Sequence, residues 1–192
     1  HGGVAVDLVG REALLGDDLD GVQREDGAAY LTGTPPDPLD GSAPDRVRIP
    51  AIGVDAPVTQ VGRDGDGWID APPPTDDNLA GWYTGAVTPG ERGTAVLVGH
   101  VDTRSGPAVF YGLGALQPGS RIEVRRADGR TAVFALYAIE VVPKEGFPAD
   151  KVYRDATVPE LRVITCGGGF TKKKGYDGNV VGYARLVDVQ AN

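Results

Sequence analysis

The stretch LRVITCGGGF, residues 161–170, runs from an apolar segment into a cysteine and three glycines. Its β-branched residues, followed at once by glycines, predict a β-strand that ends at Cys166. The glycines that follow leave room for a peptide to approach the sulfur. Cys166 is the only cysteine in the chain, which excludes an internal disulfide. Two interpretations of this thiol stay open, an inert buried cysteine and a nucleophile held at a strand end.

Further strand-like runs surround this one. The 192 residues include 29 glycines and 15 prolines, and this wealth of turn formers beside abundant valine favours many short strands. Two segments, 107–116 and 147–153, read instead as short helical turns. The strand-like runs are RVRIPAIGVDAPV (46–58), TAVLVGH (94–100), a hairpin over 121–142 with an Ala-Asp-Gly turn, ELRVITC (160–166) and NVVGYARLVDV (179–189). Together they predict a mainly β fold, a closed eight-stranded β-barrel with two short helical segments.

Charge divides the chain into two parts. Residues 1–45 contain ten acidic and two basic residues, which gives −8, whereas residues 46–192 contain 17 of each. The segment 32–45, TGTPPDPLDGSAPD, has the composition of a linker. We therefore expect an acidic N-terminal arm or stalk over 1–45, dispensable for chemistry, and a catalytic domain over 46–192. An arm that packs on the domain and covers its site is the alternative. The balanced domain has no clear basic stripe, which argues against nucleic acid as a partner.

The internal histidine completes a candidate catalytic pair. His100 follows the apolar run TAVLV as Cys166 follows LRVIT. If these two strands are parallel neighbours, both side chains lie at one rim of the sheet, held by rigid strands yet accessible. A cysteine attacks carbonyl carbons as its thiolate, and a neighbouring imidazole is the minimal group that activates it.

These motifs, in this order, resemble those of the sortases, and most closely the actinobacterial class F group. The supporting stretches are RIPAIGVDAPV, GWYTGAVTPGERGTAVLVGHVD, GPAVFYGLGALQPGSRIEV, LRVITCGGGF and YDGNVVGYARL, which span about residues 46–189. The resemblance implies a cysteine transpeptidase of Gram-positive cell surfaces. Such an enzyme cleaves a sorting signal of the Leu-Pro-x-Thr-Gly type and passes the acyl group to an amine of a peptidoglycan precursor or a pilin.

The resemblance also implies roles for individual residues. Cys166 is the nucleophile, and His100 is the acid for the leaving amine and then the base for the incoming one. Thr165 helps to shape the substrate site.

The enzyme is expected on the extracellular face of the plasma membrane. Its membrane anchor is expected to lie outside residues 1–192, since no apolar run among them approaches the length of a membrane span.

This sequence departs from the family at the third catalytic group, which in the family is an arginine at the last strand. Its position falls on Asn179, which has no charge and is assigned a substrate-positioning role. Arg185 lies six residues further along the same strand, roughly 20 Å away. Arg48, Arg104 and the lysines of 172–174 remain as sources of charge, and Arg48 is the preferred candidate. We expect an arginine head beside the thiol, on the side away from His100.

No cofactor or metal is expected. One cysteine and one internal histidine do not make a zinc site, and the acidic turn at 64–66 lacks the ligand spacing of a calcium loop. Asp102 is read as a turn residue in preference to a partner for His100, and Trp68 as a core residue. Two other functions stay open, a cysteine peptidase that releases the acyl group to water and a non-catalytic, cell-wall-associated β-barrel.

Overall fold

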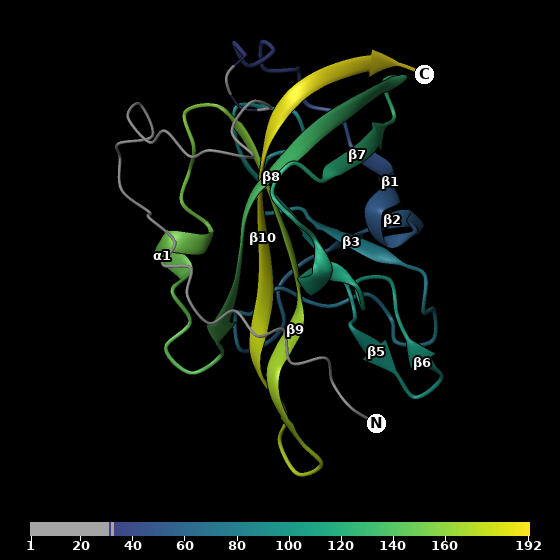
Figure 1. The fold of residues 1–192 in the computed structure, drawn as a ribbon, viewed down its shortest axis with the longest axis vertical. Coiled ribbons are helices and arrows are strands. Elements are labelled where there is room, and N and C mark those ends of the chain that lie inside the picture. Colours follow the sequence, from purple (N-terminus) through teal and green to yellow (C-terminus); the bar gives the residue numbers. More distant parts are fainter. Residues whose placement is uncertain (1–30, 32) are drawn as a thin grey trace.

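The computed structural model describes residue 31 and residues 33–192, and it contains a closed barrel of eight strands (Figure 1). Around the barrel the strands follow the order β1-β2-β3-β4-β9-β10-β8-β7. This arrangement confirms the predicted mainly β fold. The strands are β1 (Pro44–Ile49), β2 (Val54–Val61), β3 (Ala80–Tyr83), β4 (Gly93–Val98), β7 (Arg121–Arg126), β8 (Arg130–Pro143), β9 (Pro159–Thr171) and β10 (Gly175–Ala191).

The predicted hairpin and helical segments are present. β7 and β8 pair in antiparallel fashion, and Gly129 in their turn has a φ of 78°, which suits glycine. The 3-10 turn η3 (Leu113–Ala115) and the helix α1 (Ala149–Val152) lie within the two segments expected to be helical. The sequence pattern did not predict the 3-10 turn η2 (Pro50–Ile52) or the small sheet of β5 (Asp102–Thr103) and β6 (Gly106–Pro107). Within the described part of the chain, no helix is long and apolar enough to cross a membrane.

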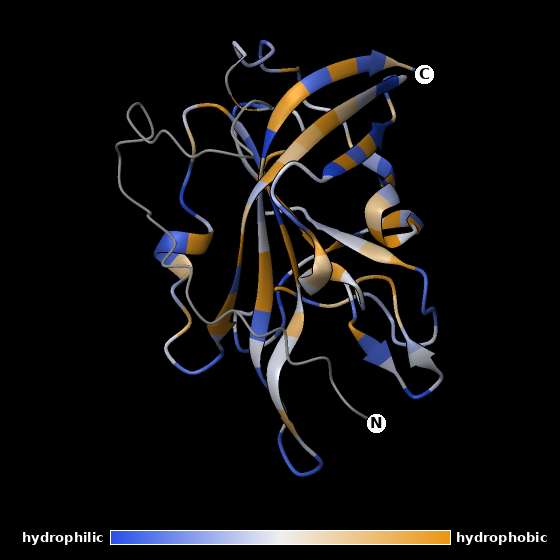
Figure 2. Ribbon diagram, in the orientation of Figure 1, coloured by the Kyte–Doolittle hydropathy of each residue, from blue (hydrophilic) through white to orange (hydrophobic). Residues whose placement is uncertain are grey.

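Residues alternate between two faces along each strand. In β7, Ile122 and Val124 are buried between more exposed neighbours, and Figure 2 shows this alternation as bands. On β4 and on the first half of β9, both faces are buried. The inner face fills the barrel, and its cluster includes Leu161 and Val163 of β9. The outer face carries a second cluster that includes Ile164 of β9.

The segment between β8 and β9 covers part of this outer cluster. Val152 of α1 is fully buried in it, with Phe147 and Tyr153 packed alongside. In Figure 1, α1 lies beside β8 and β10, outside the barrel. The two-layered packing explains why β4 reads as a continuous apolar run in place of an alternating pattern.

Residues 39–43 are fastened to the barrel, although the charge pattern assigns them to the arm. The Leu39 N–H donates to the Gly90 carbonyl over 2.8 Å, and the Ser42 hydroxyl accepts from the Asp128 N–H over 3.0 Å. The fully buried guanidinium of Arg126 donates to the carbonyls of Asp40 and Pro89. β1 itself begins at Pro44. Of the arm predicted over 1–45, residues 1–30 and 32 lie outside the described residues.

Candidate active site

The end of β4 and the middle of β9 form the base of the site, because β9 does not end at Cys166, as the sequence pattern predicted, but continues to Thr171. The two strands are parallel neighbours, with Val98 opposite Ile164, and the Gly99 N–H donates to the Ile164 carbonyl over 3.1 Å. Two residues further along each segment stand His100 and Cys166. Val98 and Ile164 both belong to the outer cluster, and the period of two along a strand places Cys166 on that same outer face. The strand arrangement on which the catalytic pair depends is therefore present.

The neighbouring strands on the other side of Cys166 supply further groups. Asn179 of β10 lies directly opposite Cys166, and Val142 of β8 lies opposite Asn179. Two residues after Val142, the Lys144 ammonium donates to the Cys166 sulfur over 3.7 Å. The thiol is half-buried and free. It is thus accessible to a substrate and has a cation beside it.

The imidazole of His100 is oriented by a backbone carbonyl. Its Nε2 lies 2.6 Å from the Pro72 oxygen. A carbonyl oxygen only accepts hydrogen bonds, so Nε2 carries the proton and Nδ1 is the nitrogen left for proton exchange. Sequence reasoning did not single out Pro72, because three adjacent prolines in a loop carry no signal of contact with a residue 28 positions away.

Asp102 is engaged by a tyrosine. The Tyr176 hydroxyl donates to Asp102 Oδ2 over 2.6 Å, which joins β10 to the small β5–β6 sheet. This hydrogen bond raises the pKa of Tyr176 to about 12, with smaller contributions from burial and from the nearby Asp102 and Cys166 charges. The Tyr176 ring also packs at 5.0 Å, centroid to centroid, on Phe170. A tyrosine and a phenylalanine therefore stand at the hairpin side of the thiol.

Thr165 lies behind the nucleophile. Its side chain is buried, and its Oγ1 has no hydrogen-bond partner among the described residues. It shares the parity of Val163, which points into the barrel. Any influence of Thr165 on the substrate site is therefore exerted through the position of Cys166 and not by direct contact.

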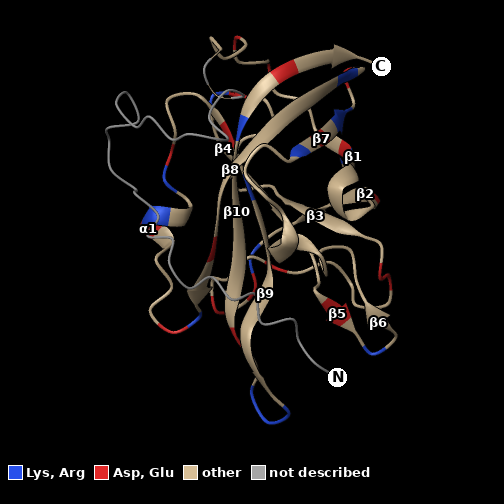
Figure 3. Cartoon of the chain, in the orientation of Figure 1, with Lys and Arg blue, Asp and Glu red and all other residues tan. Residues whose placement is uncertain are grey.

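Arg48 is not brought to the thiol, and this corrects the expectation from the sequence. It lies on β1, which is four strands from β9 in either direction around the barrel. Its Nη1 pairs with Glu123 Oε2 of β7 over 3.2 Å. Arg104 occupies the exposed turn between β5 and β6. The lysines of 172–174 cluster at the tip of the β9–β10 hairpin (Figure 3). The cation that contacts the sulfur is instead Lys144, which the sequence pattern did not single out.

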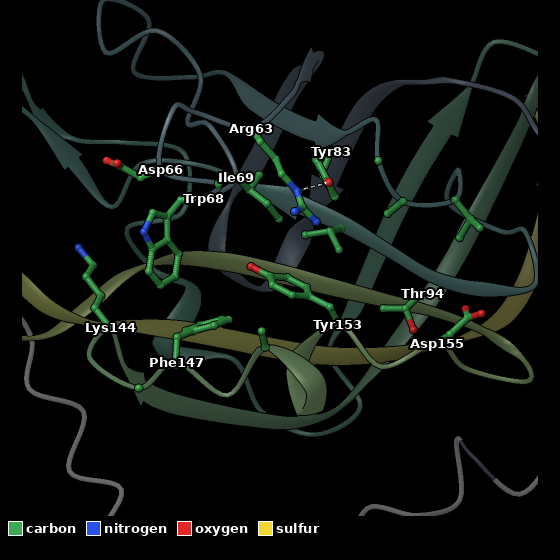
Figure 4. Close-up of a pocket in the computed structure, with 17 residues that line it drawn as sticks. Arg63, Asp66, Trp68, Ile69, Tyr83, Thr94, Lys144, Phe147, Tyr153 and Asp155 are labelled. Carbon is green, nitrogen blue, oxygen red and sulfur yellow. Dashed lines mark hydrogen bonds between the residues drawn. The ribbon is translucent and has the colours of Figure 1, made fainter.

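A cavity of about 770 Å³ opens beside the site. Its walls come from the β2–β3 connection, from β3 and β4, and from the segment that contains α1. The Phe147 ring packs edge-on against Trp68, with centroids 5.8 Å apart, and at a tilt against Tyr153, with centroids 5.6 Å apart. Figure 4 shows these rings along the cavity. Trp68 was expected in the core but is 48% exposed. Lys144 lines one end, so the cavity reaches the neighbourhood of the thiol.

The described residues contain no group of three or more side chains placed to hold a metal ion. The chemistry that the site offers comes from a half-buried thiol, an oriented imidazole and a lysine ammonium. This set is suited to nucleophilic attack on a carbonyl group.

Comparison with known proteins identifies the family. A family model described as "Sortase domain" matches residues 47–187. No curated protein sequence matches the chain. Several solved structures share its fold, including these three. Sortase A of Listeria monocytogenes has a TM-score of 0.59 and 14% identity over 79% of this chain and 91% of that one. The SrtA sortase of Actinomyces oris has a TM-score of 0.58 and 23% identity, over 83% of this chain and 89% of that one. Sortase E1 of Streptomyces coelicolor was solved with a tripeptide in its active site. It has a TM-score of 0.57 and 18% identity, over 79% of this chain and 91% of that one.

Proposed function

This chain belongs to the sortase family, and we propose that it is a cysteine transpeptidase in which Cys166 is the nucleophile and His100 moves the proton. The observation that carries the proposal is the parallel pairing of β4 with β9, since it brings the segments that bear His100 and Cys166 side by side. The proposal includes the actinobacterial class F subgroup, which rests on the sequence motifs alone.

The reaction has two halves. In the first, the Cys166 thiolate attacks a peptide carbonyl carbon, the C–N bond breaks, and the leaving amine takes a proton from Nδ1 of the His100 imidazolium. A thioester on Cys166 results. In the second, an incoming amine attacks the thioester carbon and gives a proton to Nδ1, and the C–S bond breaks. The Pro72 carbonyl holds the ring in one orientation through both halves because it accepts from Nε2.

We assign the sorting signal, of the Leu-Pro-x-Thr-Gly type, to the cavity beside the thiol. The rings of Trp68, Phe147 and Tyr153 offer apolar contact for the signal's leucine and proline. The cavity extends from these rings to Lys144, which contacts the sulfur. The acceptor is an amine of a peptidoglycan precursor or a pilin, and the enzyme acts at the extracellular face of the plasma membrane, anchored there.

A peptide assay tests the function. The protein is incubated with a fluorescent Leu-Pro-x-Thr-Gly peptide, with and without an amine acceptor. A product joined to the acceptor supports the transpeptidase. A product cleaved at the same rate in both reactions, with no joined species, supports the cysteine peptidase instead. If neither product forms and Cys166 is alkylated no faster than a thiol in the unfolded chain, the non-catalytic barrel is the right description.

A variant of Trp68 tests the placement of the signal. Trp68→Ala removes part of the aromatic wall, and we expect the KM for the peptide to rise roughly tenfold while kcat changes less than about twofold, because the contact is the same in ground state and transition state. Val141→Ala, which shortens an exposed apolar residue outside the cavity, is the matched control. Equal KM values for both variants would place the signal elsewhere.

A further inference from the structure

We propose that Lys144 is a further catalytic residue, and that its ammonium supplies the positive charge at the thiol. The inference rests on the proposed transpeptidase function. Two other residues considered for the third catalytic position do not supply a charge at the thiol. Asn179 stands opposite Cys166 but is uncharged, and Arg48 is on the far side of the barrel. Lys144 Nζ, by contrast, lies 3.7 Å from the sulfur.

The strand order puts Lys144 in a useful place. Along the sheet the strands run β4, β9, β10, β8. His100 therefore lies on the β4 side of Cys166, and Lys144 reaches the sulfur across β10 from the β8 side. The proton-transfer group and the cation flank the nucleophile from opposite directions. Neither needs to be displaced for the other to act.

The Lys144 backbone is hydrogen-bonded to β10, the strand that the Lys144 side chain crosses to reach the sulfur. The Lys144 N–H donates to the Asp177 carbonyl of β10 over 2.9 Å. The Asp177 carboxylate in turn accepts from the Gly169 N–H of β9 over 2.7 Å. Asp177 thus links the start of the β8–β9 segment to the chain just beyond the nucleophile. This link limits how far the root of the Lys144 side chain can move from the sulfur.

The ammonium is also free to act. Among the described residues, no carboxylate pairs with Lys144, whereas Lys151 on the same segment pairs with Glu140 over 3.0 Å. An ammonium has three donors. One can remain on the sulfur while another meets the carbonyl oxygen of the substrate, where negative charge develops during attack. Because Lys144 lines the cavity as well as contacting the thiol, it stands where such an oxygen would arrive.

The test uses Lys144→Ala, Lys144→Arg and, as a matched control, Lys173→Ala from the tip of the β9–β10 hairpin. The first measurement is the rate at which iodoacetamide alkylates Cys166 at pH 7 and low salt, which needs no sorting peptide. We expect Lys144→Ala to be slower by about fivefold, since the cation favours the thiolate. Lys144→Arg should retain most of the wild-type rate, and Lys173→Ala should match the wild type. High salt should reduce the difference in alkylation rate between Lys144→Ala and the wild type, because Lys144 is exposed and its charge is screened.

The second measurement is turnover of the sorting peptide, for which Lys144→Ala should lose roughly 100-fold. Equal alkylation rates for Lys144→Ala and wild type would overturn the proposal, as would equal slowing by Lys173→Ala, which would show a general effect of surface charge. If alkylation follows Lys144 but even the wild type does not turn over the peptide, the proposed function fails while the lysine–thiol pair stands. Unchanged thermal unfolding of the variants excludes a folding defect as the cause.

Discussion

The two faces of β9 differ in what they hold. The inner face is apolar up to Thr165, with Leu161 and Val163 fully buried in the barrel. The outer face buries Glu160 and Arg162 and then presents Cys166. One strand thus contributes stability through one set of alternate residues and chemistry through the other. Substitutions one position apart should therefore have separable effects.

Polar contacts stabilise the outer face of β9. Arg162 pairs with Glu160 over 2.8 Å, and its Nε donates to the Val152 carbonyl of α1 over 2.9 Å. The Tyr137 hydroxyl donates to Glu160 over 2.9 Å. Buried charges are tolerated only when they are paired and hydrogen-bonded, as these are. This network fixes the covering segment, whose first residue is Lys144, against the strand that carries the nucleophile.

Removal of the thiol should have the largest effect. Cys166→Ala should reduce transpeptidation by roughly 10⁴-fold or more, to background, because the covalent step has no substitute. Its unfolding midpoint should match the wild type, since a half-buried position tolerates a small side chain. The paired measurements are peptide turnover and thermal unfolding. Residual activity well above background would mean that another residue is the nucleophile.

Truncation on the inner face should produce the opposite pattern. Leu161→Ala leaves a cavity in the barrel and should lower the free energy of unfolding by about 2–5 kcal/mol. The folded fraction should keep near-wild-type turnover at low temperature, because Leu161 does not face the site. Urea unfolding and peptide turnover check the two halves of the expectation. Val141→Ala, on an exposed position of β8, is the control and should cost less than about 1 kcal/mol. A large loss of activity in folded Leu161→Ala would contradict the separation of stability and chemistry between the two faces of β9.

Shortening the N-terminus should have a smaller effect. A chain without residues 1–43 loses the Asp40 carbonyl that accepts from the buried Arg126, whereas a chain without residues 1–38 keeps it. We expect the longer deletion to be less stable than the shorter one by about 1–3 kcal/mol, the cost of a buried donor left unpaired. This expected loss concerns stability, whereas the sequence predicts that residues 1–45 are dispensable for chemistry. Equal stability of the two deletions, measured by urea unfolding, would show that the contacts of residues 39–43 contribute nothing.

The mildest effect should appear only at high pH. Burial raises the pKa of Tyr137 to about 12, and burial is also the main cause of the raised pKa of Tyr183. A pKa raised by folding contributes stability that is complete below the unfolded value, near 10, and is lost as pH rises towards 12. Tyr137→Phe should therefore lose stability less steeply than the wild type between pH 10 and 12, as urea unfolding at several pH values would show. If the free energy of unfolding falls equally steeply with pH in Tyr137→Phe and in the wild type, the raised pKa of Tyr137 does not contribute to stability.

The sequence predicted the barrel and the place of His100 just after a buried strand because these depend on local features. The strand expected to end at Cys166 continues instead to Thr171, since residues beyond the cysteine pair with β10. Apolar runs mark the strands, and the residues after them stand at the rim. The sequence did not predict Lys144, which reaches the sulfur only because β8, β10 and β9 are adjacent. Arg48 failed as a candidate for the same reason, since nothing local shows that β1 is four strands away. Trp68 was assigned to the core by residue type, although it lines a cavity.

The most direct test of the account is the intact mass of the protein after mixing with a Leu-Pro-x-Thr-Gly peptide and no acceptor. The account predicts a thioester adduct on Cys166 whose added mass corresponds to the peptide as far as its threonine. Addition of an amine should remove it with formation of the joined product, and Cys166→Ala should carry no adduct. Product formation without any adduct on Cys166, or with equal efficiency in Cys166→Ala, would contradict the assignment of this thiol as the nucleophile.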